Sequence, residues 1–290
     1  MKIYLDGKLV DREKAVISVF DHGLLYGDGV FEGIRTYDSL VFRLKEHIDR
    51  LYRSADAIEL KIPLTKPEMV KAVIDTLKAN SLKDAYIRLV VTRGVGDLGL
   101  DPRKCPKATV FIIADKIALY PQKYYEHGLA IITASTRRNL PQALDPRIKS
   151  LNYLNNILAK IEAIKAGTEE AIMLSYDKHV AECTGDNIFI VLGGKLMTPL
   201  VSIGALEGIT RDAVIKIAKA SGIPFCEKIL NMEDLYAASE VFLTGTAAEI
   251  VPVVKIDGQM IGDGKPGKLT LNLREELKKL TKSDGVKYEV

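Results

Sequence analysis

The sequence predicts an α+β protein. Apolar residues alternate in strand fashion on both sides of Asp6-Gly7, a pattern typical of a β-hairpin at the start of the chain. Apolar residues then recur with a helical period over residues 46–58, and again after Pro67, a residue type that suits the first turn of a helix. With 290 residues, of which 47% are hydrophobic, the chain is long enough for one large domain or two moderate ones.

The first part of the chain predicts a mixed unit of strands and helices that ends near residue 120. Ile48, Leu51 and Ala55 fall on one face of the first helix, as a helix packed on a core requires. After the hairpin we expect strands at residues 30–37, 40–44, 85–92 and 109–114, and helices at residues 46–58 and 67–77.

A polar stretch over residues 135–146 contains two prolines and has no periodicity, so we interpret it as a connector. Beyond it we expect helices near residues 152–166, 210–220 and 266–282, and strands near residues 171–175, 187–191, 195–197, 241–244 and 251–256. We accordingly place a small domain at residues 1–125 and the start of a large domain at 126–136. An interdomain connector follows at 137–147, and the rest of the large domain, which contains Lys149, at 148–290.

Composition favours a cytoplasmic protein that acts on small molecules. The net charge is only +3 and basic residues are scattered among acidic ones, so no basic face suggests nucleic acid or anionic lipid. No apolar run approaches the roughly 20 residues of a membrane span, and the N-terminus has no signal-peptide pattern. Three distant cysteines fit neither a disulfide framework nor a metal site.

Lys149 is the candidate for covalent chemistry. It precedes an apolar helix and follows Arg147, and desolvation and cationic neighbours both favour the neutral amine that a nucleophilic lysine needs. The alternative is a solvated surface lysine. Three turns are further candidates, each weak alone: Glu182-Cys183-Thr184-Gly185, Gly208-Ile209-Thr210-Arg211 and Thr244-Gly245-Thr246-Ala247. The first places an acid at a strand end, and the other two offer backbone donors for an anion. The alternatives are a hairpin with a solvated Glu182 and ordinary tight turns.

Six motifs in order closely resemble the class IV aminotransferases, over nearly the whole chain: residues 26–35 (YGDGVFEGIR), 47–51 (HIDRL), 149–153 (KSLNY), 182–187 (ECTGDN), 208–211 (GITR) and 244–249 (TGTAAE). The resemblance implies fold type IV, the two-domain architecture of D-amino-acid and branched-chain aminotransferases, and pyridoxal 5′-phosphate as cofactor. It also implies that an amino acid and a 2-oxo acid are exchanged in two half-reactions with ping-pong kinetics.

The resemblance assigns roles to the cofactor site. Lys149 would bond to the cofactor's aldehyde and carry the proton of the substrate Cα. Glu182 would bind the pyridine nitrogen, and Tyr153 the 3′-oxygen. The phosphate would be bound by Arg50, Ile209, Thr210 and Thr246. Alternatives are that Arg50 is a surface residue of its helix and that Tyr153 belongs to the core.

Within the family, the substrate motifs are most similar to those of branched-chain aminotransferases. The implied substrate-binding residues are Tyr26, Phe31, Gly33, Tyr86, Arg88, Leu98, Leu100, Thr246 and Ala247. Enzymes specific for D-amino acids carry Arg-x-His in the loop after Val91-Thr92-Arg93-Gly94, and this chain lacks it. Either Arg88 or Arg93 would bind the acidic side chain of the co-substrate.

The loop from Gly94 to Leu100 resembles the family's segment that reaches the neighbouring subunit's site, which implies a homodimer at least and allows a hexamer. Asp28-Gly29 departs from many branched-chain enzymes and is common in the D-specific and lyase branches. The alternatives are therefore a D-amino-acid aminotransferase, an aminodeoxychorismate lyase, and a ligand-binding protein without catalysis, against which intact Lys149 and Glu182 argue.

Overall fold

The computed structural model describes residues 1–116 and 120–290, and the chain forms two compact units. The first unit comprises Met1–Ile117, Ile148–Asn152 and Thr281–Val290, and the second comprises Ala118–Arg147 and Tyr153–Leu280. Lys149 and the C-terminal segment thus group with the N-terminal part of the chain, whereas the sequence placed both in the second domain. The boundaries of independently folding domains stay a prediction.

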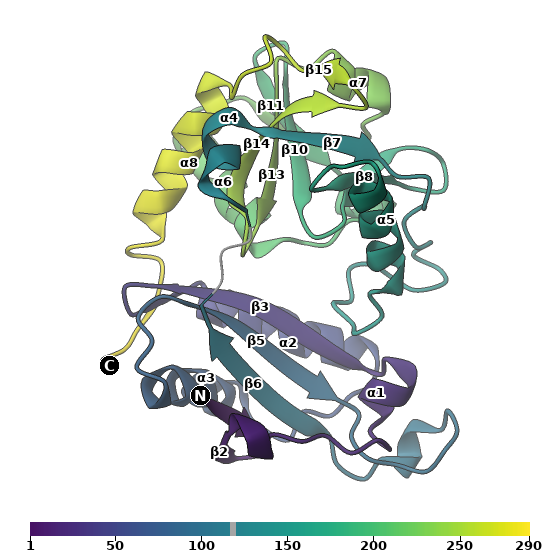
Figure 1. Cartoon of the computed structure of the whole chain (residues 1–290), viewed down its shortest axis with the longest axis vertical. Coiled ribbons are helices and arrows are strands. Elements are labelled where there is room, and N and C mark those ends of the chain that lie inside the picture. Colours follow the sequence, from purple (N-terminus) through teal and green to yellow (C-terminus); the bar gives the residue numbers. More distant parts are fainter. Residues whose placement is uncertain (117–119) are drawn as a thin grey trace. The chain divides into compact units, whose positions relative to one another are not determined.

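The first unit contains a seven-stranded sheet in the order β16-β4-β3-β5-β6-β1-β2. Helices α2 (Leu44–Ala57) and α3 (Lys66–Ala79) cover one face of it (Figure 1) and bury Ile48, Leu51 and Met69 in its core. The strands are β1 (Lys2–Leu5), β2 (Lys8–Asp11), β3 (Gly29–Tyr37), β4 (Leu40–Phe42), β5 (Ala85–Thr92), β6 (Thr109–Asp115) and β16 (Gly285–Lys287), and the short helices are η1 (Arg12–Lys14), α1 (His22–Tyr26) and η2 (Pro102–Lys104).

The second unit contains a nine-stranded sheet in the order β12-β11-β10-β13-β14-β7-β8-β9, with β15 paired to β14. Its strands are β7 (Leu129–Thr133), β8 (Ala171–Leu174), β9 (Val180–Cys183), β10 (Asn187–Leu192), β11 (Lys195–Pro199), β12 (Phe225–Lys228), β13 (Glu240–Gly245), β14 (Glu249–Ile256) and β15 (Gln259–Met260). Its helices are α4 (Gln122–His127), α5 (Leu154–Lys165), η3 (Val201–Ile203), α6 (Ile209–Ala220), α7 (Met232–Tyr236) and α8 (Lys268–Leu280). No helix among the residues that the structure describes is long and apolar enough to cross a membrane.

The α+β prediction is confirmed, and the five predicted helices all form, with each end within two residues of its predicted position. The strand predicted at residues 40–44 is too long. It ends at Phe42, because Arg43 adopts a left-handed conformation with φ 46° and α2 begins at Leu44. A side chain in this conformation is uncommon, and a pattern of apolar residues does not reveal it.

Backbone pairing places Lys149 beside β3. The Phe31 amide donates to the Lys149 carbonyl (3.0 Å), and the Leu151 amide donates to the Gly29 carbonyl (2.9 Å). Along β3, β4 pairs only with the last two residues, Thr36 and Tyr37. The edge of β3 at its beginning is therefore open to the segment around Lys149, where Val30 pairs with Ser150. The Lys149 amide in turn donates to the Ser54 hydroxyl of α2 (3.1 Å). The sheet therefore fixes the backbone from which the lysine side chain extends.

Candidate active site

Five predicted site residues meet on one part of the β3–β5 pair. The Lys149 Nζ lies 4.4 Å from the centroid of the Phe31 ring, and the Arg88 guanidinium carbon lies 3.4 Å from it. Gly33 is paired with Arg88 in the sheet, and the Tyr86 hydroxyl occupies the space where a Cβ on residue 33 would stand. A larger residue than glycine would therefore displace Tyr86. The arrangement combines an aromatic wall, two cationic side chains and a hydroxyl group.

Arg50 is a buried residue and not a surface residue of its helix. Its Nε and Nη2 donate to the two oxygens of Glu32, each at 2.7 Å, and His47 Nδ1 lies 2.7 Å from Glu32 Oε2. Burial alone would raise the pKa of Glu32, but the charge of Arg50 and the hydrogen bonds from both partners outweigh burial and hold that pKa at about 2. Glu32 and His47 lie within two of the sequence motifs, but neither had a predicted role. The available signal was an acid inside an apolar strand, which needs a partner.

Arg93 binds groups of its own unit. Its Nε and Nη2 donate to the two oxygens of Asp28 at 2.8 and 3.0 Å, and the guanidinium also donates to the carbonyls of Ile58 (2.6 Å) and Glu59 (2.8 Å). Asp28, the residue that departs from many branched-chain enzymes, therefore has a structural partner. Of the two arginines considered for the acidic co-substrate, Arg88 is the one that lies against the Phe31 ring.

Tyr26, Leu98 and Leu100 form a separate group at the loop that follows β5. The Tyr26 hydroxyl accepts a hydrogen bond from the Gly99 amide (2.9 Å), so the end of α1 braces the loop. The side chains of Leu98 and Leu100 are 72% and 80% exposed. Their part in substrate binding stays a prediction.

In the second unit, Glu182 is buried and held by two donors. Arg138 Nε donates to one of its oxygens (2.8 Å) and the Leu206 amide to the other (2.9 Å). Arg138 is oriented in turn by the side-chain oxygens of Asn155 and Asn156, each at 3.1 Å. Sequence reasoning missed Arg138, which lies in the polar stretch read as a connector. Because buried carboxylates are usually paired, a cationic partner for Glu182 could be expected, but the sequence does not show which residue it is.

Asn187 contacts two of the predicted turns of the second unit, the one at Gly208 and the one that begins at Thr244. Its amide donates to the Leu206 carbonyl (2.9 Å), and β10 pairs Asn187 with Thr244 of β13. Gly208 packs against the Asn187 side chain and precedes α6, whose first residues are the predicted phosphate ligands Ile209 and Thr210. Thr246 and Ala247 follow the end of β13, and Tyr153 stands directly before α5. A helix start beside a turn of small residues is suited to an anion.

A carboxylic acid lies beneath the Thr244–Ala247 turn. Asp186 is buried, accepts a hydrogen bond from the Tyr120 hydroxyl (3.3 Å), and packs so closely on Gly245 that a Cβ there would collide with its Oδ1. Burial, together with the negative charges of Glu170 and Glu182, raises the pKa of Asp186 to about 7. The turn thus rests on an acid that is protonated below neutral pH.

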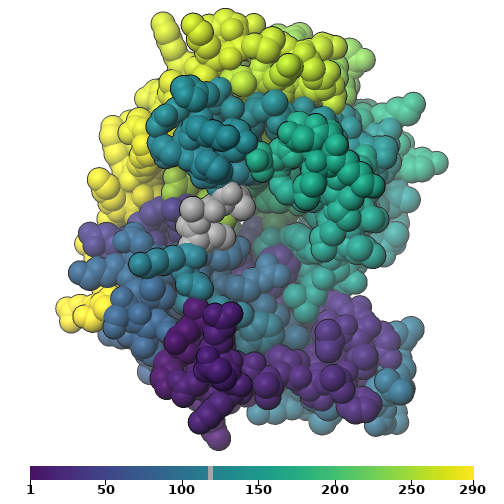
Figure 2. All heavy atoms as spheres, in the orientation of Figure 1, coloured from purple at the N-terminus to yellow at the C-terminus, as the bar shows by residue number. Residues whose placement is uncertain are grey.

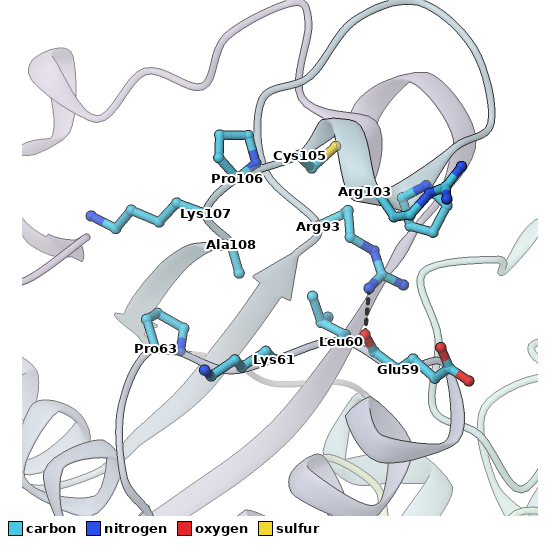
Figure 3. Close-up of a pocket in the computed structure, with 11 residues that line it drawn as sticks. Glu59, Leu60, Lys61, Pro63, Arg93, Arg103, Cys105, Pro106, Lys107 and Ala108 are labelled. Atoms are coloured by element: carbon cyan, nitrogen blue, oxygen red, sulfur yellow. Dashed lines mark hydrogen bonds between the residues drawn. The ribbon is translucent and has the colours of Figure 1, made fainter.

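A cavity of about 450 Å³ elsewhere in the first unit is not the candidate site. Figure 3 shows Arg93 donating to the Glu59 carbonyl at its edge, with Lys61 and Lys107 on the rim. Of the predicted residues, only Arg93, one of the two arginines considered for the co-substrate, lines it. Within residues 1–116 and 120–290, no group of histidine, cysteine or acidic residues is placed to hold a metal ion.

Each unit by itself carries groups that suit pyridoxal phosphate. Lys149 offers an amine beside an aromatic ring, Glu182 offers an oriented carboxylate for a ring nitrogen, and Gly208 leaves the start of α6 without a side-chain cap. The Thr244 hydroxyl is buried with no hydrogen-bond partner among the described residues, as expected for an atom that awaits a ligand.

Residues 29–256 match the family model described as Amino-transferase class IV, and the chain belongs to this family of pyridoxal-phosphate-dependent aminotransferases. A Methanocaldococcus jannaschii protein provisionally named a branched-chain-amino-acid aminotransferase is 58% identical over 99% of both chains.

Solved structures confirm fold type IV. The Escherichia coli branched-chain amino acid aminotransferase is 37% identical with a TM-score of 0.95, covering 98% of this chain and 96% of that one. The Thermoproteus uzoniensis branched-chain aminotransferase with norvaline is 42% identical with a TM-score of 0.92 and the same coverage.

Replacing Asp186 with asparagine should change how stability depends on pH. The folded protein keeps a proton on Asp186 up to about pH 7, whereas the unfolded chain releases it above about pH 4, so this group makes the wild-type protein less stable as the pH rises between those values. In urea unfolding at several pH values, the free energy of unfolding of the variant minus that of the wild type should increase as the pH rises through this window. Above the window the difference should stay constant. The exposed Asp177→Asn is the control. A wild-type slope retained in Asp186→Asn would contradict the assignment.

Proposed function

We propose that the chain transfers the amino group of L-leucine, L-isoleucine or L-valine to 2-oxoglutarate. The observation that carries this proposal is the placement of the Lys149 amine and the Arg88 guanidinium against one aromatic ring, Phe31. An aromatic wall suits a branched apolar side chain, and a cation suits the carboxylate of the alternative substrate. The names of the relatives support the same substrates, and a branched-chain amino acid aminotransferase 38% identical to this chain has been solved with N-(5′-phosphopyridoxyl)-L-glutamate.

In the first unit, Lys149 would hold the cofactor covalently and Arg50 would bind its phosphate. In the second, Glu182 would bind the pyridine nitrogen, Tyr153 the 3′-oxygen, and Ile209, Thr210 and Thr246 the phosphate. When bound, the cofactor supplies an electron-withdrawing ring that makes the substrate Cα–H acidic. The Lys149 Nζ would take the proton from Cα and return a proton in the reverse half of the exchange. Arg138 would keep Glu182 oriented throughout.

Substrate recognition divides between charge and shape. Thr246 and Ala247 would bind the substrate carboxylate through their backbone, while Phe31 and Gly33 would shape the side-chain pocket. Arg88 would bind the distal carboxylate of 2-oxoglutarate, because its guanidinium lies against the same Phe31 ring as the Lys149 amine. Tyr86 would contribute its hydroxyl group to the same pocket, and Tyr26 would contact the substrate from the separate group at the loop after β5.

The D-amino-acid reading has less support. The loop after β5 continues Val95-Gly96-Asp97-Leu98, which offers no Arg-x-His pair for a carboxylate. Asp28, the feature that favoured the D-specific and lyase branches, is explained by its ion pair with Arg93.

We further propose a cytoplasmic homodimer as the smallest working assembly. Exposed apolar side chains gather on the early segment and on the loop after β5 of the first unit, and on α5 of the second: Val16, Val19, Phe20, Leu24, Leu98, Leu100, Leu154, Ile157 and Ile164. Figure 2 shows the N-terminal segments, in purple, at the surface of the first unit. Apolar surface of this extent favours contact with a second copy.

The visible absorption band of the bound cofactor tests the substrate class. Adding L-leucine to the holoenzyme should bleach the band, and 2-oxoglutarate should restore it, because each half-reaction converts the cofactor between its two forms. D-Alanine should leave the band unchanged, and Lys149→Ala, the control, should respond to neither amino acid. A response to D-alanine alone would contradict the L-branched-chain proposal.

Steady-state kinetics test the role of Arg88. Arg88→Gln should raise the KM for 2-oxoglutarate roughly tenfold or more relative to the KM for 4-methyl-2-oxopentanoate, because only the first substrate carries a second carboxylate to lose a charge-assisted hydrogen bond. Arg93→Gln, which breaks the pair with Asp28, should lower the melting temperature and leave the ratio of the two KM values unchanged. The reverse pattern would assign the co-substrate to Arg93.

A further inference from the structure

Glu32 is a buried anion for which sheet packing alone gives no reason. It lies on β3 with no exposed surface, on the side of the strand that faces α2. His47 and Arg50 extend from one face of α2, three residues apart, and both contact the Glu32 carboxylate. Burying a carboxylate is costly, and removing such a group together with its partners can leave a core equally stable. The cluster therefore suggests a role beyond holding the helix on the sheet.

The contact geometry orients Arg50. A guanidinium is planar and carries five N–H groups in a rigid fork. Glu32 takes the Nε and Nη2 side of that fork, with both distances at 2.7 Å. Because the group is rigid, fixing this side also fixes the direction of the remaining edge, formed by Nη1 and Nη2. The long arginine side chain would otherwise sample many rotamers in the absence of a ligand.

His47 braces the same carboxylate. Burial lowers the pKa of His47 most, and the positive charges of Arg50 and Lys149 lower it further, while Glu32 opposes both effects. The net pKa lies below the ordinary value, so the imidazole is neutral at neutral pH. Since Glu32 is ionised, Nδ1 is the donor to Oε2, and Nε2 is buried without a hydrogen-bond partner among the described residues. One turn beyond Arg50 on α2, Ser54 accepts from the Lys149 amide. The same helix face thus carries Arg50 and touches the segment that carries Lys149, the other predicted cofactor ligand of this unit.

We propose that Glu32 is a positioning residue, which acts through Arg50, braced by His47, to set the direction of the guanidinium edge that binds the cofactor phosphate. The inference rests on the proposed role of Arg50. Glu32 carries a negative charge close to the group that would bind a phosphate, so its charge alone weakens phosphate binding. Its orienting effect strengthens binding. If the charge of Glu32 is removed, the first effect predicts tighter phosphate binding and the second predicts weaker phosphate binding.

The test is the affinity of the apoprotein for pyridoxal phosphate and for pyridoxal, which lacks the phosphate. For Glu32→Gln we expect the dissociation constant of pyridoxal phosphate to rise about tenfold or more, as is typical when a supporting partner of a ligand is lost, and that of pyridoxal to stay unchanged. Asp49→Asn, which removes an exposed acid next to Arg50 on α2, is the matched control and should change neither constant. Tighter or unchanged binding of pyridoxal phosphate by Glu32→Gln would overturn the proposal.

A double-mutant cycle shows whether Glu32 acts through Arg50. In an Arg50→Gln background, Glu32→Gln should cause little further loss of pyridoxal phosphate affinity, because there is no guanidinium left to orient. An equal loss in both backgrounds would overturn the proposal. A failure of the proposed Arg50 role is seen separately, as an Arg50→Gln variant whose affinity for pyridoxal phosphate relative to pyridoxal is that of the wild type. If Glu32→Gln does not fold, Glu32→Asp retains the charge, shortens the reach of the carboxylate, and should show the same phosphate-specific loss.

Discussion

The pairing of residues 149–151 with the start of β3 is the constraint on which the candidate site of the first unit depends. Two backbone hydrogen bonds join a segment from the middle of the chain to a strand near its beginning. Because the pairing is made by the backbone, it sets the side chains on alternate sides, and the Lys149 amine comes to the Phe31 ring. Arg88 reaches the same ring through the register of β5 on β3. A shift of that register by one residue would turn Arg88 to the other face.

One buried carboxylate in each unit is compensated in the same way: it receives an arginine and at least one further donor. Glu32 receives Arg50 and His47, and Glu182 receives Arg138 and the Leu206 amide. Such pairs contribute little to stability, because desolvation of the charges offsets their attraction. What they provide is direction, since each group is held in one orientation before any ligand binds. Preorganised charge is the feature that a cofactor-dependent reaction needs from its protein.

Much of this arrangement could be predicted from the sequence. Helical periodicity located α2 and α3, because each helix buries a stripe of apolar residues, and α5, α6 and α8 were also predicted. Short strands such as β7 and β12 were not predicted, because four or five residues carry too little pattern to separate strand from loop. The grouping of Lys149 with the first unit and the pairing of Arg138 with Glu182 were also missed. Both depend on contacts between distant parts of the chain, which local pattern does not encode.

Whether Lys149 is the amine that carries the cofactor can be tested without any substrate. Borohydride reduction of the holoenzyme fixes the cofactor to the amine that bears it, and mass spectrometry of the digested protein locates the modified residue. We expect a phosphopyridoxyl group on the peptide containing Lys149 and on no other peptide. A modification at another lysine, such as Lys61 or Lys107 on the rim of the cavity in the first unit, with Lys149 unmodified, would contradict it.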